Sequence, residues 1–309
     1  MAVLAHRRRR LILLALLTGF PLMVWVLNAS TAGGREQGCP QGCAVRTTRR
    51  PGPLRVMSFN VLHGFPNFEN LGERLELTAA EILRQDADLV LLQEVPWTRR
   101  VRDGAKLLAQ RTGFNYLYLR AQGNRWAILF EDGVAILSRF PLKNPAIVEL
   151  KPREMFFEPR VALSAVAETP WGDLPLFVTH LASSDDQINR GQVVALREFV
   201  ASRTDGLGIV AGDFNATPDT PQIESLTEGW IDTYHTANPQ DMGLTCCIDD
   251  LHAPPGEPLE ERIDYIFLVP GRGVQVISAQ LILDQPSPFA DGWLWASDHV
   301  GLLVIMEFP

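Results

Sequence analysis

Polar and ionisable residues recur at the ends of apolar stretches along this 309-residue chain, where the surrounding pattern predicts β-strands. Asn60 closes one such stretch, Glu94 a second and His180 a third. The same pattern places Asp213, Asn215, Asp264, Asp298 and His299 at later strand ends. Strand ends are where α/β folds gather active-site groups. A single polar strand end is usually a hydrogen-bonded terminus, but buried carboxylates need a partner or a metal ion, so the whole set predicts one polar site.

The elements that must position these residues alternate along the body of the chain. Apolar runs predict strands at 54–60, 88–94, 115–119, 127–130, 134–138, 162–167, 174–180, 208–212, 263–269, 274–283 and 300–307. Apolar residues at helical spacing predict helices over 71–83 and 187–202. Several neighbouring strands have no helix between them, which disfavours a purely parallel sheet and favours an α/β fold with two mixed β-sheets flanked by helices.

The first 28 residues are typical of a membrane anchor or signal segment. Arg7 to Arg10 precede an apolar run of 17 residues, from 11 to 27. Signal-peptide cores have about 7–15 residues, and bilayer-spanning helices about 17–25. We expect an uncleaved anchor with the rest of the chain on the outer side of the cell membrane, because arginine blocks stay cytoplasmic. Cleavage after the small residues Ser30, Thr31 and Ala32, followed by secretion, is the alternative.

Residues 29–53 show no periodicity and are rich in Gly, Thr and Arg, which predicts a flexible linker before a single domain at 54–309. Cys39 and Cys43 lie in this linker, and Cys246 and Cys247 are adjacent in the domain. An exported chain can form disulfides, but the spacing does not determine their pairing. Neither pair has the two-residue gap common in structural zinc sites.

The charge is unevenly distributed. Eight of the 28 Lys and Arg residues lie in the first 50 positions, whereas 35 of the 36 Asp and Glu residues follow them. The body of the chain is therefore acidic, which disfavours tight non-specific binding of nucleic acid. A metal ion could still bridge an acidic site to an anionic substrate. The composition also excludes a disordered polyelectrolyte and a polytopic membrane protein.

Taken together, the motifs resemble the endonuclease/exonuclease/phosphatase superfamily of metal-dependent phosphoesterases. This superfamily includes deoxyribonucleases, abasic-site endonucleases, sphingomyelinases and inositol-polyphosphate 5-phosphatases. The resemblance covers residues 54–307 and rests on short motifs in the family order: Ser58-Phe-Asn-Val, Gln93-Glu-Val, Gly133-Val-Ala-Ile-Leu-Ser-Arg, Thr179-His-Leu, Gly212-Asp-Phe-Asn, Arg262-Ile-Asp-Tyr and Ser297-Asp-His. It implies a four-layer α/β/β/α sandwich of two mixed β-sheets flanked by helices, with the site at the top of both sheets.

The resemblance also implies a role for each residue of the site. Glu94, with Asn60 and Asp298, would hold a divalent cation, Mg²⁺ or else Mn²⁺ or Ca²⁺, since oxygen ligands suit hard ions. Asp213 would orient or deprotonate the attacking water, and Asn215 would donate to the phosphate. His180 and His299 would flank the phosphoryl group, with Asp264 fixing the tautomer of His299.

Two features bear on the substrate. Leu62 stands where abasic-site endonucleases carry an acid, which weakens a DNA-repair function, and the neighbouring His63 is a candidate substrate contact or a locally bonded loop histidine. Trp293 and Trp295 form either an apolar rim for a lipid or a base, or part of the core. We expect a phosphodiesterase acting on nucleic acid, on a phospholipid headgroup as sphingomyelinases do, or on a phosphometabolite. A non-catalytic, membrane-tethered binding protein on the same fold is the alternative.

Overall fold

The computed structural model describes residues 18–19, 22–23, 32–33, 35–38, 52–155, 158–204, 206–271 and 273–309. Most of the predicted anchor, and both Cys39 and Cys43, lie outside these residues. No helix in the described part of the chain is long and apolar enough to cross a bilayer.

The first sheet carries Asn60 and Glu94. Its strands lie in the order β1-β5-β6-β3-β2-β16-β13, and β4 pairs with β3. Their bounds are β1 Arg35–Gly38, β2 Leu54–Asn60, β3 Leu89–Thr98, β4 Arg102–Asp103, β5 Asn115–Asn124, β6 Phe130–Ser138, β13 Gln275–Ile282 and β16 Gly301–Glu307. The pair β2 and β3 is parallel and the other pairs are antiparallel, so the sheet is mixed.

The second sheet carries His180, Asp213 and Asp264. Its order is β11-β12-β10-β9-β8-β7, with only β9 and β10 parallel among its pairs in the described chain. The bounds are β7 Leu142–Met155, β8 Glu158–Thr169, β9 Gly172–His180, β10 Gly208–Asp213, β11 Ile231–Asp232 and β12 Asp264–Val269. A separate hairpin is formed by β14 Ser287–Phe289 and β15 Gly292–Leu294.

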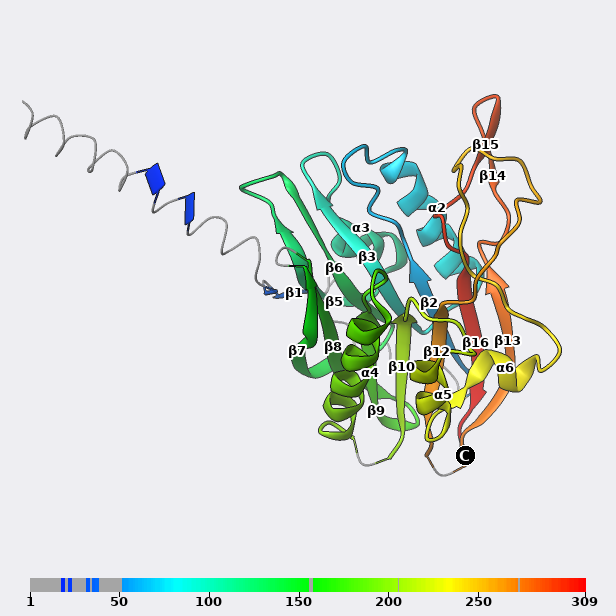
Figure 1. Cartoon of the computed structure of the whole chain (residues 1–309). Helices are drawn as coiled ribbons and strands as arrows, with labels where there is room; N and C mark the ends of the chain where they lie inside the picture. The colour runs from blue at the N-terminus through cyan, green and yellow to red at the C-terminus, as the bar shows by residue number, and fades with distance from the viewer. Residues whose placement is uncertain are drawn as a thin grey trace, which may run out of the picture.

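The two sheets pack face to face, and helices cover their outer faces (Figure 1). Leu54, Leu91, Leu163, Val178 and Ala211 belong to the core between the sheets. On the first sheet lie α2 (Leu71–Arg84) and α3 (Gly104–Thr112), and on the second lie α4 (Asp186–Ala201) and α5 (Pro221–Thr227). A short helix, α6 (Thr233–Ala237), packs beside β12 and β13. The four-layer α/β/β/α sandwich expected from the sequence is confirmed.

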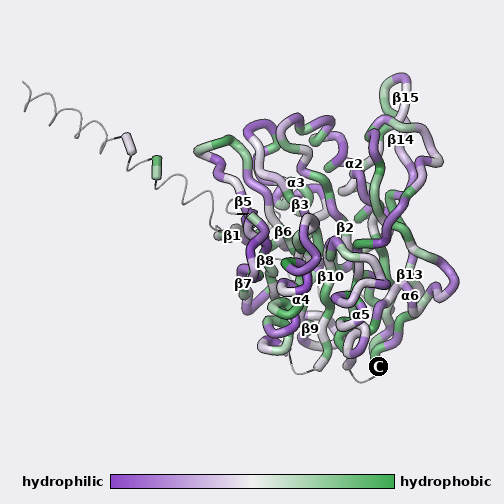
Figure 2. Tube along the Cα trace, viewed as in Figure 1, coloured by the Kyte–Doolittle hydropathy of each residue, from purple (hydrophilic) through white to green (hydrophobic). Residues whose placement is uncertain are grey.

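Hydropathy explains the layers. In the part of the chain that the structure describes, the inner strands of both sheets are largely hydrophobic, whereas many of the loops are hydrophilic (Figure 2). Leu71, Leu75 and Ile82 form the buried face of α2, at the spacing that predicted this helix. Burial of such faces on both sides of each sheet is what holds the strand ends in register.

Two of the expected elements are wrong. Residues 127–129, expected in a strand at 127–130, form a turn before β6 begins at Phe130. The carbonyl of Asn124 accepts from the amides of Ala127 and Ile128, and the Asn124 side chain accepts from Trp126 and Ala127, so this segment is closed on itself. Arg35–Gly38, expected in the flexible linker 29–53, instead forms β1 and pairs with β5.

Candidate active site

The register of the strands brings the predicted site residues to one end of the two sheets. In the second sheet, Asp213 lies opposite His180 on β9 and opposite Asp264 on β12. In the first sheet, Asn60 lies opposite Gln93, which places Glu94 beside it. Gly212 allows the close approach of β10 and β9, because a Cβ there would collide with the carbonyl oxygen of Thr179.

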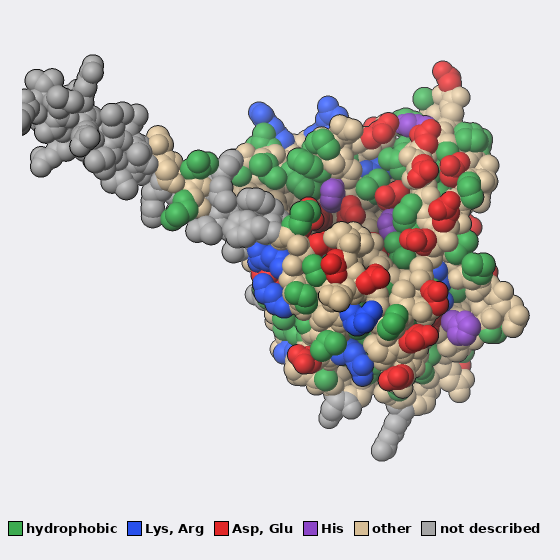
Figure 3. Space-filling model, viewed as in Figure 1, with side chains coloured by type: hydrophobic (Ala, Val, Ile, Leu, Met, Phe, Trp, Pro, Cys, Tyr) green, Lys and Arg blue, Asp and Glu red, His purple; other side chains and the backbone are tan. Residues whose placement is uncertain are grey.

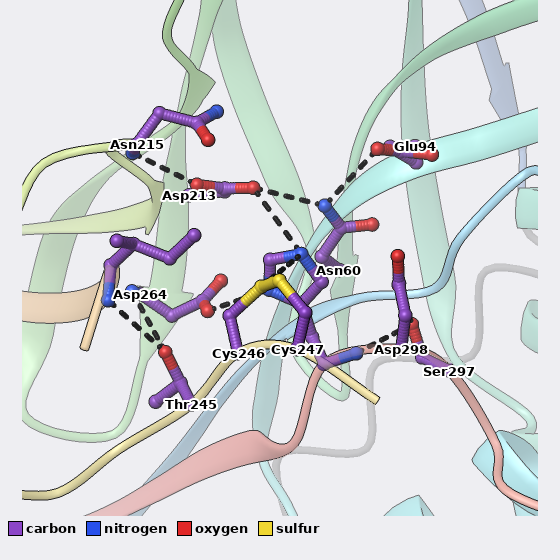
Figure 4. The surroundings of a disulfide bond; sticks show 12 residues. Asn60, Glu94, Asp213, Asn215, Thr245, Cys246, Cys247, Asp264, Ser297 and Asp298 are labelled. Atoms are coloured by element: carbon purple, nitrogen blue, oxygen red, sulfur yellow. Dashed lines mark hydrogen bonds and ion pairs between the residues drawn. A yellow bond between two sulfur atoms is a disulfide. The ribbon is translucent and has the colours of Figure 1, made fainter. Parts of the chain in front are cut away.

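One carboxylate oxygen is the centre of the site. Asp213 Oδ2 accepts a hydrogen bond of 3.0 Å from Asn60 Nδ2, and it lies 3.4 Å from His180 Nε2 and 3.8 Å from His299 Nε2. Asn60 belongs to one sheet and Asp213 to the other, so this contact joins the two sheets. Asp213 Oδ1 accepts from the backbone amide of Asn215, which fixes the carboxylate plane (Figure 4).

Asp264 and His299 form a buried pair next to this centre. Asp264 Oδ2 lies 2.8 Å from His299 Nδ1, which leaves Nε2 facing Asp213. A carboxylate bonded to Nδ1 requires the proton on that nitrogen and thereby sets the ring orientation. Thr245 Oγ1 accepts from the backbone amides of Ile263 and Asp264 and so secures the strand that carries the carboxylate.

The site perturbs the pKa values of its three central groups in different directions. Burial, followed by the nearby charge of Asp264, raises the pKa of Asp213 to about 7. Burial opposes the charged form of His299, but the negative charge of Asp264 and their hydrogen bond outweigh it, so the pKa of His299 lies well above its ordinary value. Burial lowers the pKa of His180 well below its ordinary value, and the positive charge of Arg160 adds to this effect. The site thus combines a carboxyl group with a pKa near neutrality, Asp213, with an imidazolium, His299, and a neutral imidazole, His180.

Glu94 occupies a bulge in β3. The pairing with β6 shifts between Leu92 and Val95, and Glu94 has a φ of 52°, a left-handed conformation uncommon for a residue with a side chain. Its carboxylate accepts from Asn60 Nδ2 at 3.3 Å and from the backbone amide of His63 at 3.1 Å. Burial raises the pKa of Glu94, but the charge of His63 and these hydrogen bonds outweigh it and hold it below its ordinary value.

The donor set suits a hard divalent cation. Glu94 and Asp298 are neighbouring carboxylates. Burial raises the pKa of Asp298, and the negative charge of Glu94 raises it further. In the described chain, ligand atoms of Asp213, Asp264 and His299 also lie within 4.8 Å of one another. Oxygen-rich groups of this kind are the ligands that Mg²⁺ and Ca²⁺ prefer. Asn60 directs its amide nitrogen at the carboxylates, while its oxygen accepts from Leu62, so as oriented it positions Glu94 and Asp213.

Two other predicted residues lie at the edge of this centre. The side chain of Asn215 donates to the carbonyl oxygen of Leu181, and its φ of 48° turns the chain away from β10. His63 Nε2 lies 3.4 Å from Glu94 Oε2, and His63 Nδ1 accepts from the amide of Phe65. Contact of either residue with substrate stays a prediction. Trp295 is buried and donates to the carbonyl of Ala253, so it belongs to the core rather than to a rim.

Sequence reasoning missed two buried polar residues that support the site. Arg74 on α2 donates to the carbonyls of Val61, Leu62 and Ala296, and so links the loop after Asn60 to the loop before Asp298. Asn189 on α4 donates to the carbonyls of Ala182 and Phe214, in the loops that follow His180 and Asp213. The available signal was a polar residue on the apolar face of a predicted helix.

The adjacent cysteines lie beside the same pair of residues. Cys246 and Cys247 are joined by a disulfide (Figure 4), and Cys246 Sγ lies 3.7 Å from His299 Nε2. The backbone of Cys246 forms isolated antiparallel β-bridges with Glu261 and with His299. This segment therefore packs between the loops that present Asp264 and His299.

Comparisons with known proteins identify the family of the chain and its fold. The model of the "Endonuclease/Exonuclease/phosphatase family" matches residues 57–299. Among solved structures, a family protein from Leptotrichia buccalis superposes with a TM-score of 0.63 at 20% identity, covering 82% of this chain and 100% of its own. A mannosyl-6-phosphatase from Bacteroides thetaiotaomicron gives 0.65 at 16% identity, covering 82% and 100%. A humanized D. rerio TDP2 gives 0.63 at 19%, covering 83% and 99%. No curated protein sequence matches the chain.

Proposed function

Because the chain belongs to the endonuclease/exonuclease/phosphatase family, we propose that it is a divalent-metal-dependent phosphodiesterase in which water attacks phosphorus. The observation that carries this proposal is the convergence of Asn60, His180 and His299 on Asp213 Oδ2 at the junction of the two sheets. A water bound at Asp213 Oδ2 would have this carboxylate as its base and the ring nitrogens of His180 and His299 as nearby donors.

The central groups divide the work according to their protonation. With a pKa near 7, Asp213 can accept the proton of the attacking water at neutral pH. His299, held as the imidazolium by Asp264, offers Nε2–H to charge that develops on the phosphoryl oxygens. His180 is neutral and donates a hydrogen bond without adding charge to the site.

A divalent cation, which we propose to be Mg²⁺ with Mn²⁺ or Ca²⁺ as substitutes, would be held by Glu94 and Asp298. When bound, it would stabilise negative charge on the phosphoryl and leaving oxygens. Glu94 is held ionised by His63 and Asn60, which prepares it for a cation. The bulge at Glu94 aims this carboxylate out of the sheet and into the site.

Hydrolysis of bis(p-nitrophenyl) phosphate by the full chain tests the proposal. We expect release of p-nitrophenol with Mg²⁺, its loss in EDTA, and a fall of about 10²-fold or more in kcat for Asp213→Asn, the range for loss of a general base. Asp219→Asn is the matched control, because Asp219 lies exposed six residues along the same loop. Equal rates for wild type and Asp213→Asn would contradict the role given to Asp213, whereas no hydrolysis by the wild type with Mg²⁺ would favour the non-catalytic, membrane-tethered binding protein.

We further infer that the domain works on the outer side of the cell membrane, tethered by residues 1–28 or secreted after their cleavage. The supports are Arg7 to Arg10 and the apolar run that follows them. Nucleic acid, a phospholipid headgroup and a phosphometabolite each contain the ester that the site would cleave. The acidic body of the chain argues against a processive nuclease.

A further inference from the structure

A large groove opens beside the candidate active site, between the loop that follows β2 and the turn that precedes β6. Its volume is about 960 Å³, and its lining includes Phe65, Phe68, Leu107, Ile128 and Leu129. Apolar side chains of this size in a groove at the surface mark a binding site more often than chance exposure does.

Four large apolar side chains are exposed at this groove and beside it. Trp126 is 86% exposed, Phe65 and Ile128 are each 47% exposed, and Leu129 is 45% exposed. We call these four residues the apolar shelf. Trp126, Ile128 and Leu129 share the turn that the Asn124 hydrogen bonds close, so the fold holds them outward in a fixed arrangement. Exposing four large apolar side chains together is costly unless something covers them.

The shelf connects directly to the site. Phe65 stacks on Phe130 with 4.8 Å between ring centroids, and Phe130 meets the ring of His63 at 4.9 Å. His63 in turn contacts Glu94, through its backbone amide at 3.1 Å and through Nε2 at 3.4 Å. A molecule with an apolar part on the shelf would therefore present its polar end to the proposed metal ligand.

The charge around the shelf differs from that of the rest of the domain. Arg99 and Arg100 are exposed and line the same groove together with the acids Glu73 and Glu76, and Glu76 is paired with Arg111. In Figure 3, basic groups project beside hydrophobic side chains at the upper edge, whereas acidic side chains spread over the right-hand part of this face. Apolar and aromatic side chains next to exposed arginines are typical of surfaces that enter an anionic lipid interface.

We propose that the apolar shelf, with Arg99 and Arg100, docks on an anionic lipid bilayer and that the phosphoester headgroups of its lipids are the substrate class. The choice of lipid headgroups as substrates rests on the phosphodiesterase activity proposed above, but the docking on the bilayer does not. Trp126, Ile128 and Leu129 enter the interface, Arg99 and Arg100 meet the lipid phosphates, and Phe65 borders the path to Glu94. An N-terminal anchor would add to this contact by keeping the domain near the bilayer.

Fluorescence quenching in the full chain tests the docking. The protein is reconstituted in bilayers of phosphatidylglycerol with or without bromine on the acyl chains near the headgroup. Because the chain has 7 Trp, the signal of Trp126 is taken as the difference between wild type and Trp126→Phe. We expect bromine to quench this signal at least twofold, and Arg99→Gln/Arg100→Gln to reduce the quenching. Met242→Ser, which changes a 72%-exposed methionine away from the groove, is the control and should leave it unchanged.

Two results would overturn the proposal. One is an equal Trp126 signal with and without bromine. The other is quenching of Trp126 by single-stranded DNA but not by the brominated bilayer, which would assign the shelf to nucleic acid. Since quenching needs no turnover, hydrolysis of bis(p-nitrophenyl) phosphate in the same preparation shows separately whether the phosphodiesterase proposal holds.

Discussion

Replacing Asp264 by asparagine isolates the contribution of the buried carboxylate behind His299. The two side chains are almost inaccessible to solvent and lie 2.8 Å apart, so the change removes a charged hydrogen bond while keeping the shape of the side chain. Hydrogen bonds to charged groups contribute about 1.5–3 kcal/mol. If His299 stabilises the transition state through this bond, kcat/KM should fall by about 10- to 100-fold.

Two measurements test the effect of Asp264→Asn. Steady-state hydrolysis of bis(p-nitrophenyl) phosphate gives kcat/KM for wild type, Asp264→Asn and the exposed control Asp249→Asn. NMR titration of the imidazole gives the protonation of His299. The charge of Asp264 is the largest influence raising the pKa of His299 against its burial, so that pKa should fall markedly in Asp264→Asn. A purely structural role of Asp264 would not produce this shift together with normal folding.

A double-mutant comparison provides the refutation. Because Asp264 is argued to act through His299, Asp264→Asn should cost nothing further in a His299→Ala background. Multiplicative losses in the double variant, or an unchanged pKa of His299 in Asp264→Asn, would show that the pair does not work as a unit.

Three further predictions concern the dependence of activity on Mg²⁺, the hydrogen bonds of Arg74, and the effect of pH on stability through the buried Asp132. Glu94→Gln should raise the Mg²⁺ concentration for half-maximal activity by more than about tenfold, since even residues behind metal ligands have effects of this size; Glu73→Gln, an exposed change, should not. Arg74→Met leaves four loop carbonyls without this donor and should lower the free energy of unfolding in urea by about 3 kcal/mol, against a small effect for the exposed Arg84→Met. Burial raises the pKa of Asp132 to about 6, so the folded protein binds this proton more tightly than the unfolded chain. Stability should therefore fall as pH rises from about 4 to 6, and Asp132→Asn should be up to about 3 kcal/mol more stable than wild type at pH 7.5 but equal at pH 4.

Sequence patterns predicted the elements whose burial is one-sided or complete. The helix at 71–83 and the strand at 54–60 have strong apolar periodicity, and both are found as α2 and β2. Polar residues ending such strands were equally visible, which is why the predicted site residues were identified before the geometry. Their meeting at Asp213 depends on two sheets packing together, and short-range patterns do not encode that packing.

The missed elements have weaker signals for physical reasons. Strand β7 is an edge strand with Pro145 and Pro152 and is mostly half-exposed, so it lacks the apolar run of an inner strand. The apolar run at 127–130 was misread, because Ile128 and Leu129 face solvent in a turn and the strand begins only at Phe130. Arg74 and Asn189 were overlooked because they act through backbone carbonyls that only the folded chain brings near.

The position of the site explains why membership of the family predicts the type of reaction but not the substrate. Asn60, Glu94, His180, Asp213 and Asp264 stand on β2, β3, β9, β10 and β12, whose spacing is set by the core between the sheets, and Asp298 and His299 stand in the loop just before β16. The shelf stands on a loop and a turn outside the two sheets. Such segments change in length and composition without disturbing the sheets. Selectivity for the group attached to the phosphate should therefore be determined at the shelf, by the side chains at Phe65, Trp126 and Leu129, while the strand ends perform the hydrolysis.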